Sequence, residues 1–350
     1  MVISRNLLIK GNKRAYTIPV FGEQMQTADY VYDELDIYSH KIANEVIFYD
    51  KHTLSKPKHH TLGIVKGKTL KFCKFTKGIQ YDDPANIFSN ESEITVGKAL
   101  DIASDVNLWF TDDAYWHFLY EDLPVLKHFK DNNYPIVTSP LNSWQKELLN
   151  YFGDIKNRIV EVPIPCTITA DNFYFYTESN AGGGKNSEWA NNFVKDYLQP
   201  SKNFSPTKKI YISRQDADVR KVTNEKQVTE HLKAKGFEIV ENMPNKSIQE
   251  KIDLFAEAQI VISVSGSTLC HVHSMQPGTT VIDVNHLMNL NPARSIQEFA
   301  FNNVGDTVGV KWYSILGNTK GFSTLNRARR SMDKDLEIEL DVLDKILEQV

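Results

Sequence analysis

A turn of small residues, Ser265-Gly-Ser-Thr268, is a segment of this sequence that could bind an anion. It follows the β-branched run Ile260–Val264, which is typical of a strand buried on both faces, and it precedes a predicted short helix. Backbone N–H groups at a helix start attract negative charge, and Gly266 would let a phosphate approach the backbone closely. The turn therefore predicts a diphosphate site, with small residues needed only for packing as the alternative.

Two arginines, Arg214 and Arg220, follow the first predicted strand of the same half of the chain. Because ligands of open α/β sheets bind at the carboxyl ends of parallel strands, we expect this loop on the same rim as the turn. Guanidinium groups can clamp a diphosphate bidentately and neutralise its charge as it leaves, so that no metal would be needed. Surface ion pairs with nearby carboxylates are the alternative for both arginines.

His117 and Glu121 are the candidate proton acceptors. They are four residues apart, so they share one face of a helix predicted over Ala114–Lys130. Either side chain could act as a general base, and a purely structural histidine is the alternative. Asp122 is a weaker candidate base, whereas Asp112-Asp113 is expected to cap the helix.

Strands and helices alternate in the second half of the chain, which indicates a parallel sheet with right-handed crossovers. Asn224 is expected to cap one helix, and Ser247 with Glu250 forms a capping box at the start of another. The predicted strands are Lys209–Ser213, Phe237–Val240, Ile260–Val264 and Thr280–Val284, and the predicted helices are Asn224–Lys235 and Ser247–Ala258.

The first half also has an α/β pattern, with weaker boundaries. Its candidate strands are Ile18–Phe21, Glu45–Tyr49, Asn107–Phe110, Pro135–Val137, Ile159–Val162 and Asn172–Tyr176, and its further helices are Leu141–Phe152 and Ser187–Leu198. A chain of 350 residues favours two domains, because single cores stop growing at about 250–300 residues.

The polar, proline-bounded stretch from Pro200 to Thr207 is typical of a linker. We therefore predict a first domain at 1–200, a linker at 201–207 and a second domain at 208–334. Residues 335–350 are predicted to form an amphipathic helix that packs back on the first domain.

Composition excludes several classes of protein. The net charge of −4 argues against nucleic acid as a partner, and three widely spaced cysteines suggest neither disulfides nor a zinc site. No apolar run approaches the length of a membrane span or a signal peptide, so a cytoplasmic protein is expected.

Two further motifs have alternative readings. Arg327–Arg330 could contact anionic lipid at a membrane surface, with a solvated face as the alternative. Ala181–Lys185 lacks the glycine spacing of a phosphate-binding P-loop, which favours a flexible loop.

Several motifs together resemble glycosyltransferase family 61 in order and spacing. In the first half, Trp116–Pro124 is similar to that family's His-Phe-x-x-Glu-x-x-Pro segment. In the second half the similar segments are Tyr211–Glu225, Gly236–Val240, Ala258–Leu269 and Pro277–Asp283.

The resemblance implies an α/β protein of the GT-B type, with two Rossmann-like domains facing across a cleft. It further implies an inverting transferase that uses a nucleotide sugar, usually UDP-linked, without a bound metal or prosthetic group. Arg214, Arg220 and Asp283 and the turn residues Ser265, Gly266, Ser267 and Thr268 would then bind the donor. The sequence departs from the family where many members have His-Gly-Ala-Gly-Leu-Thr-Asn and this chain has Ser265–His271.

The leading hypothesis is thus a cytoplasmic transferase that adds a sugar to a saccharide or glycolipid acceptor of a surface polysaccharide, such as a capsule or lipopolysaccharide. A non-catalytic nucleotide-sugar-binding or scaffold protein is the alternative, and a nucleotide-sugar epimerase is a lesser one. The donor sugar, the acceptor, the linkage and the oligomeric state do not follow from the sequence, because specificity depends on a few side chains that the sequence does not mark.

Overall fold

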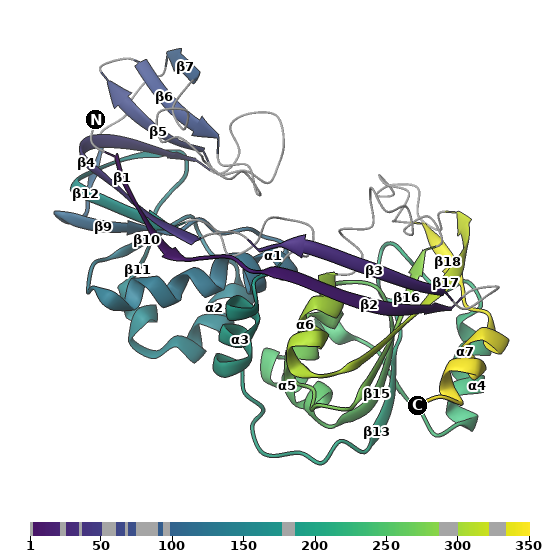
Figure 1. The fold of residues 1–350 in the computed structure, drawn as a ribbon. Helices are drawn as coiled ribbons and strands as arrows, with labels where there is room; N and C mark the ends of the chain where they lie inside the picture. Colours follow the sequence, from purple (N-terminus) through teal and green to yellow (C-terminus); the bar gives the residue numbers. More distant parts are fainter. Residues whose placement is uncertain are drawn as a thin grey trace. The chain divides into compact units, whose positions relative to one another are not determined.

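The computed structural model describes residues 3–21, 26–34, 37–50, 61–66, 69–74, 90–93, 99–176, 186–286, 300–321 and 334–350. The chain divides into two compact units, each made of two segments (Figure 1). The first unit contains Met1–Asn12 and Asp33–Gly182, and the second contains Lys13–Tyr32 and Gly183–Val350. The Ala181–Lys185 and Arg327–Arg330 segments lie outside the described residues.

The strands described in the first unit form one mixed sheet, in the order β11-β10-β9-β12-β4-β5-β6-β7, with β1 paired to β4 and β8 to β12. The strands β9 to β12 run parallel, and β4 continues the sheet antiparallel to β12. The bounds are β1 Ile3–Ile9, β4 Ile37–Asp50, β5 Thr61–Lys66, β6 Thr69–Lys74, β7 Asn90–Glu93, β8 Leu100–Asp101, β9 Asp105–Leu108, β10 Ile136–Thr138, β11 Ile159–Glu161 and β12 Cys166–Tyr176. The α/β prediction is therefore confirmed here, with a mixed sheet.

The predicted helix Ala114–Lys130 is present, but it is not one regular α-helix. It consists of α1 (Tyr115–His117), a π-helical turn η2 (Phe118–Asp122) and a 3-10 segment η3 (Leu123–Asp131). Pro124 has no N–H to donate back along the helix, and the Trp109 Nε1 donates to the Asp122 carbonyl oxygen at 2.8 Å. Both features remove regular helical hydrogen bonds, which accounts for the change in winding. The helices that follow are α2 (Ser143–Leu149) and the 3-10 segment η4 (Asn150–Arg158).

The second unit is built on a sheet in the order β14-β13-β15-β16-β17-β2-β3, with β18 paired to β17. Its strands from β14 to β17 are parallel, as the alternating pattern predicts. The strands are β2 Lys13–Phe21, β3 Gln26–Asp33, β13 Lys208–Ile212, β14 Glu238–Val240, β15 Ala258–Val264, β16 Thr280–His286, β17 Lys311–Gly321 and β18 Asp335–Glu337. The helices are α3 Glu188–Tyr197, α4 Glu225–Ala234, η5 Met243–Asn245, α5 Ile248–Ala256, η6 Ser267–Ser274, α6 Ala300–Val308 and α7 Leu340–Leu347.

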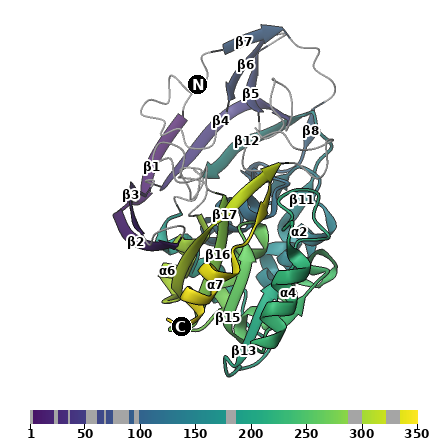
Figure 2. The ribbon, with the colours of Figure 1, turned by 90° about the vertical axis from the view of Figure 1, so that its right-hand side faces the viewer.

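Helices cover both faces of this sheet. Apolar residues of α4 and α7 share a buried core with β15 and β16, whereas α5, η6 and α6 pack together on the other face (Figures 1 and 2). On β16, Ile282 and Val284 belong to the core under α4 and α7. Because side chains alternate along a strand, Asp283 and Asn285 point to the opposite face.

One of the two helix caps predicted in the second half of the chain is present. The Ser247 side chain accepts from the Glu250 N–H, and the Glu250 side chain accepts from the Ser247 N–H, which confirms the capping box. The Asn224 cap is wrong, because the Asn224 side chain instead donates to the Ile338 carbonyl and accepts from the Ile338 N–H. A partner far along the chain outcompetes the local one, and it ties α4 to the C-terminal segment.

The amphipathic segment 335–350 is only partly helical, since β18 precedes α7. Its packing on the first domain is wrong for the described residues. Val342, Leu343 and Ile346 lie in one core with Val228 and Leu232 of α4, so the apolar stripe is buried in the second unit.

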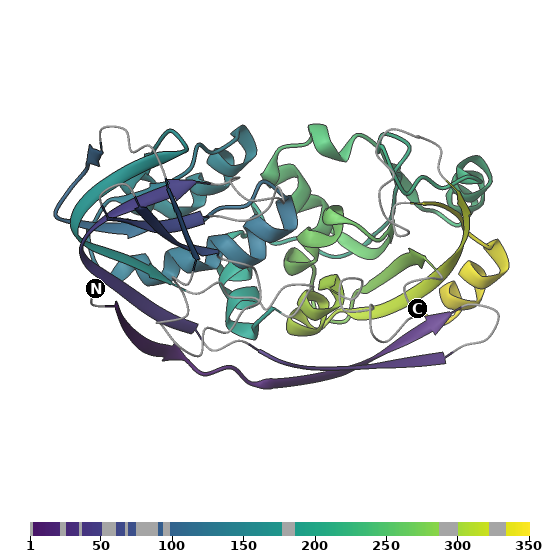
Figure 3. The same ribbon diagram turned by 90° about the horizontal axis from the view of Figure 1, so that it is seen from above.

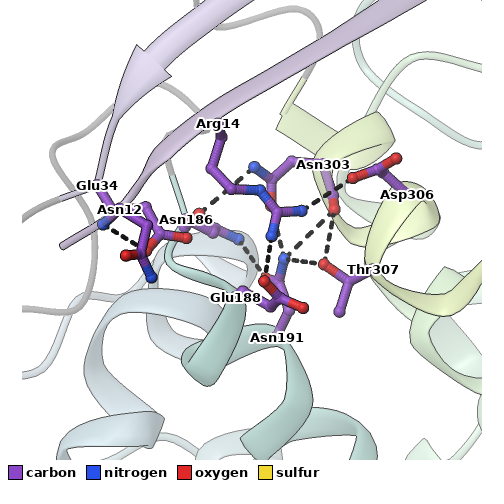
Figure 4. A network of polar contacts seen from close by, with 9 residues as sticks. All are labelled: Asn12, Arg14, Glu34, Asn186, Glu188, Asn191, Asn303, Asp306 and Thr307. Carbon is purple, nitrogen blue, oxygen red and sulfur yellow. Dashed lines mark hydrogen bonds and ion pairs between the residues drawn. The ribbon is translucent and has the colours of Figure 1, made fainter.

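Two segments that the sequence assigned to the first domain belong to the second unit, namely the hairpin β2–β3 and α3. Arg14 on β2 pairs with Glu188 of α3 at 2.5 Å and with Asp306 of α6 at 2.8 Å (Figure 4). The Asn191 Nδ2 donates to the Asn303 Oδ1 at 2.6 Å and to the Thr307 hydroxyl at 3.0 Å.

β2 also pairs in parallel with β17, and the hairpin appears as two adjacent purple strands in Figure 3. The sequence pattern reveals neither the β2–β17 pairing nor the contacts of α3, because the partners are more than a hundred residues away.

In the described ranges, no helix is both long and apolar enough to cross a membrane.

Candidate functional site

Arg214 lies two residues after the end of β13 and contacts its own loop and the facing turn. Its Nη2 donates to the Val219 carbonyl at 3.3 Å, and its Nε is buried without a hydrogen bond to any residue that the structure describes. Burial and, to a smaller extent, the positive charge of Arg220 together lower the pKa of Arg214 to about 10. The negative charge of Asp216 opposes this decrease only in part, so the charge of the guanidinium is incompletely compensated.

Gly266 is needed at the turn for reasons of space. Its φ of 172° is ordinary extended backbone, which any residue adopts. A Cβ at this position would lie 2.5 Å from the Arg214 Nη1, so a larger residue would displace the guanidinium. The two predicted clusters are thus in contact, because the missing side chain of one makes room for the arginine of the other.

Arg220 contacts the same turn one residue earlier, at Ser265. Its Nη1 donates to the Ser265 carbonyl oxygen at 2.7 Å, and its backbone has a left-handed φ of 60°. Residues other than glycine seldom adopt this conformation, so the surrounding contacts must hold the loop in place. The structure brings Arg214, Arg220 and Ser265 together, as the strand-end argument predicts.

The remaining turn residues open η6. Since η6 begins at Ser267, the backbone N–H groups of Ser267 and Thr268 lie in its first turn, which confirms the predicted short helix. Ser267 is exposed and Thr268 is half-buried. Further along η6, His271 and His273 are buried. Burial lowers the pKa of His273 to about 4 and that of His271 well below its usual value, so both imidazoles are neutral at pH 7.

Asp283 lies on β16, between β15 and β17, and is level with Ser263 of β15 and Ser314 of β17. It is fully buried, and its Oδ2 accepts from the Asn285 Nδ2 at 2.9 Å. Burial raises the pKa of Asp283 to about 7, although the hydrogen bonds from Asn285 and Ser265 and the charge of Arg220 oppose the rise. Its Oδ1 makes no hydrogen bond to the residues described.

Sequence reasoning missed two partners of this site. Asn285 follows Asp283 at the strand period of two, which was the available signal for a shared face. Glu225 is one of the nearby carboxylates that the alternative reading would pair with the arginines, but its Oε2 accepts from the Tyr211 hydroxyl at 2.6 Å. Burial is the main cause that raises the pKa of Glu225.

In the first unit, His117 and Glu121 form a hydrogen-bonded pair. The His117 Nδ1 lies 2.6 Å from the Glu121 Oε1, across the junction of α1 and η2. Glu121 is completely buried, whereas a quarter of the His117 side chain is exposed. A substrate could therefore reach the imidazole but not the carboxylate.

The neighbouring aspartates have structural contacts. The Asp122 Oδ2 accepts from the Asp112 N–H at 2.5 Å, and the Asp112 Oδ1 accepts from the Ala114 N–H at 2.7 Å. Asp112 thus accepts from the N–H of the N-cap residue Ala114, just before α1. This contact resembles the expected cap, although Asp112 does not occupy the N-cap position itself. Among the residues that can be described, no group of three or more His, Cys, Asp or Glu side chains is placed to hold a metal ion.

Comparison with known proteins agrees with these motifs. Residues 115–282 match the family model described as Glycosyltransferase 61. Among solved structures, the iron-containing dodecameric glycosyltransferase TibC from enterotoxigenic E. coli H10407 is similar at 10% identity and a TM-score of 0.34, over 87% of this chain and 85% of that one. The search of curated proteins finds no match. Over residues 115–282, the chain has the sequence pattern of the glycosyltransferase 61 family, which supports a glycosyltransferase.

Proposed function

We propose that the protein is an inverting glycosyltransferase, which moves a sugar from a UDP-linked donor to a hydroxyl group of a saccharide or glycolipid acceptor. The observation that carries the proposal is the contact of Arg214 with the Gly266 turn inside the matched family span. Two arginines and the N–H groups of a helix start converge there on one rim of a parallel sheet, where α/β proteins bind phosphorylated ligands.

The arginine pair is suited to the leaving group. Arg220 lowers the pKa of Arg214, which means that the two cations repel each other when no anion is present. A diphosphate would relieve this repulsion, and it gains charge as the bond to the sugar breaks. Preorganised cations then stabilise the transition state more than the ground state.

His117 is the general base of the proposed reaction, and Glu121 is the residue that positions it. The contact with Glu121 engages Nδ1, so Nε2 is the ring nitrogen that can take a proton from the acceptor hydroxyl. Glu121 is buried, and its carboxylate stabilises the imidazolium that forms. The acceptor oxygen attacks the anomeric carbon as the nucleotide leaves from the opposite face, which inverts the configuration.

Other features of the proposal follow the family resemblance. We place the donor on the second unit and the acceptor on the first, in a two-domain GT-B arrangement. We further propose a cytoplasmic role in surface polysaccharide synthesis. Activity is expected without an added metal, so UDP release in excess EDTA should equal release in its absence.

Release of UDP by the purified protein tests the proposal. His117→Ala and Glu121→Gln should lower turnover by roughly 10²–10⁴-fold, the usual contribution of general base catalysis. Arg214→Ala should weaken donor binding and slow UDP departure. Lys226→Ala is the control, since this side chain is 88% exposed on α4. Full turnover in both His117→Ala and Glu121→Gln would rule out His117 as the general base.

A second candidate function is a nucleotide-sugar-binding protein without catalysis. It is favoured by one observation, the loss of the family's His and Asn around the turn at Ser265–His271. Calorimetric binding of UDP, with no turnover over a broad panel of donors and acceptors, would distinguish it from the transferase.

A further inference from the structure

The buried carboxyl of Asp283 is connected to the arginine pair through Ser265. The Ser265 carbonyl accepts from the Arg220 Nη1 at 2.7 Å, and its N–H donates to the carbonyl of Val284, next to Asp283, at 3.0 Å. The Ser265 hydroxyl and the Arg220 charge both act on the Asp283 carboxyl. One residue thus links the loop that holds Arg220 to the strand that holds Asp283.

The surroundings of Asp283 contain few other charges. Its cross-strand neighbours, Ser263 and Ser314, are neutral, and the η6 histidines on this side of the sheet are kept neutral by burial. Among the described residues, Arg220 is the charged group that acts on Asp283. Burial disfavours the ionised carboxylate, and this is opposed first by the hydrogen bonds from Asn285 and Ser265 and then by the positive charge of Arg220. The carboxylate thus relies on Arg220 for part of its compensation.

We propose that binding of a diphosphate between Arg214 and Arg220 is coupled to the uptake of a proton by Asp283, which makes Asp283 a positioning residue for Arg220. The inference rests on the proposed function for the identity of the anion. Without ligand, the Asp283 carboxylate compensates part of the Arg220 charge. A bound diphosphate takes over that role and repels the nearby carboxylate, so Asp283 accepts a proton from solvent at a carboxyl oxygen. The proton returns to solvent when the anion leaves.

The pKa of Asp283 places the effect in an accessible range. Since this pKa is about 7 without ligand, binding should take up roughly half a proton at pH 7 and close to one at pH 8. Affinity should fall as pH rises above 7, by at most about tenfold per pH unit. A side chain that only maintains the fold would not produce this proton linkage.

Isothermal titration calorimetry of the full chain, in buffers with different ionisation enthalpies, measures the proton count. The probes are UDP-glucose, whose phosphates do not titrate near neutrality, and inorganic pyrophosphate. Asp283→Asn should abolish the uptake with UDP-glucose and lower it by the same amount with pyrophosphate. Ser314→Ala removes a neighbouring polar group that does not titrate, so this control should retain the uptake.

Each outcome decides between the proposals. Binding of either probe without proton uptake, or with unchanged uptake in Asp283→Asn, would overturn the coupling. If pyrophosphate binds with Asp283-dependent uptake and no UDP-sugar binds, the coupling stands and the donor assignment fails. If neither probe binds, both proposals fail. Should Asp283→Asn not fold, the pH dependence of affinity in the wild-type protein decides, and a flat profile from pH 6 to 8.5 contradicts the coupling.

Discussion

At the scale of single residues, the contact of Gly266 with Arg214 is the most informative, because it joins two motifs that are 52 positions apart in the sequence, from 214 to 266. The atom that an added Cβ would meet is the far end of a long side chain. We therefore expect the guanidinium to move in a substituted protein while the backbone stays. Function would suffer more than stability.

Gly266→Ala tests this expectation. The free energy of unfolding of the variant should lie within about 1 kcal/mol of the wild-type value, since a displaced arginine side chain is a small perturbation of the fold. Its dissociation constant for UDP or pyrophosphate should rise roughly tenfold, because one of two charge-assisted contacts is misplaced. Lys226→Ala should change neither quantity. A variant with normal affinity would show that the arginine does not hold the anion.

Asp283 should also affect stability as a function of pH. Its pKa is about 7 in the folded protein and near 4 in the unfolded chain, so the unfolded state ionises first. The folded protein then holds more protons between these values, and the free energy of unfolding decreases as pH rises from 4 through 7. Asp283→Asn removes this loss. Thermal unfolding at pH 5 and pH 8 should show a stability advantage of the variant that grows with pH.

Residue types and strand ends were enough to predict Arg214, Arg220 and Ser265 on one rim. They were not enough to find Asn285 or Tyr211 as neighbours, because those contacts depend on which strands are adjacent. The same limit applies to Glu225, a possible arginine partner only in the alternative reading, whose partner Tyr211 lies on β13.

At the scale of elements, the segment from α1 to η3 shows how a local irregularity places a side chain. The periodicity of the sequence predicts one helix, and the positions of His117 and Glu121 on a shared face are retained. The π-helical winding of η2 was not predictable from period alone, since it depends on Pro124 and on Trp109, the residue that follows β9. The candidate base is therefore positioned by contacts outside its own helix.

The buried amides between α3 and α6 supply a test at this scale. Asn191→Ala would leave the Asn303 Oδ1, now 2.6 Å from its donor, buried without that partner. Loss of such a bond costs about 1–3 kcal/mol. Chemical denaturation should show this decrease, whereas Lys226→Ala should stay within about 0.5 kcal/mol of the wild type. An unchanged midpoint would mean that α3 contributes little to the second unit.

At the scale of the whole molecule, ligand binding should stabilise the unit that binds it. A ligand at a hundredfold excess over its dissociation constant adds about 2.7 kcal/mol to the stability of the binding unit. Differential scanning calorimetry with UDP, GDP and CMP should therefore shift the transition of the second unit for one nucleotide. If the calorimetric trace resolves two transitions, the one from the first unit should remain in place. A shift confined to the transition of the first unit would place the nucleotide there and contradict donor binding by the second unit.

The two-unit organisation was only partly predictable. Alternating strands and helices correctly indicated the parallel sheet of residues 208–286, because each element carries its own periodicity. The sequence could not reveal that residues 13–32 belong to this same unit, since β2 shows only an extended pattern and its partner β17 lies almost 300 positions later. Local signals define elements, and pairing between distant strands defines units.

The discontinuity of the second unit has a consequence for its synthesis. The chain passes between units at residues 12–13, 32–33 and 182–183. A ribosome makes β2 almost 300 residues before β17, the strand that β2 pairs with. While the residues between them are made, the edge of β2 that pairs with β17 has no native neighbour and is open to aggregation or to binding by a chaperone. Completion of the second unit must therefore wait for β17, even though strands β13 to β16 can assemble as they emerge.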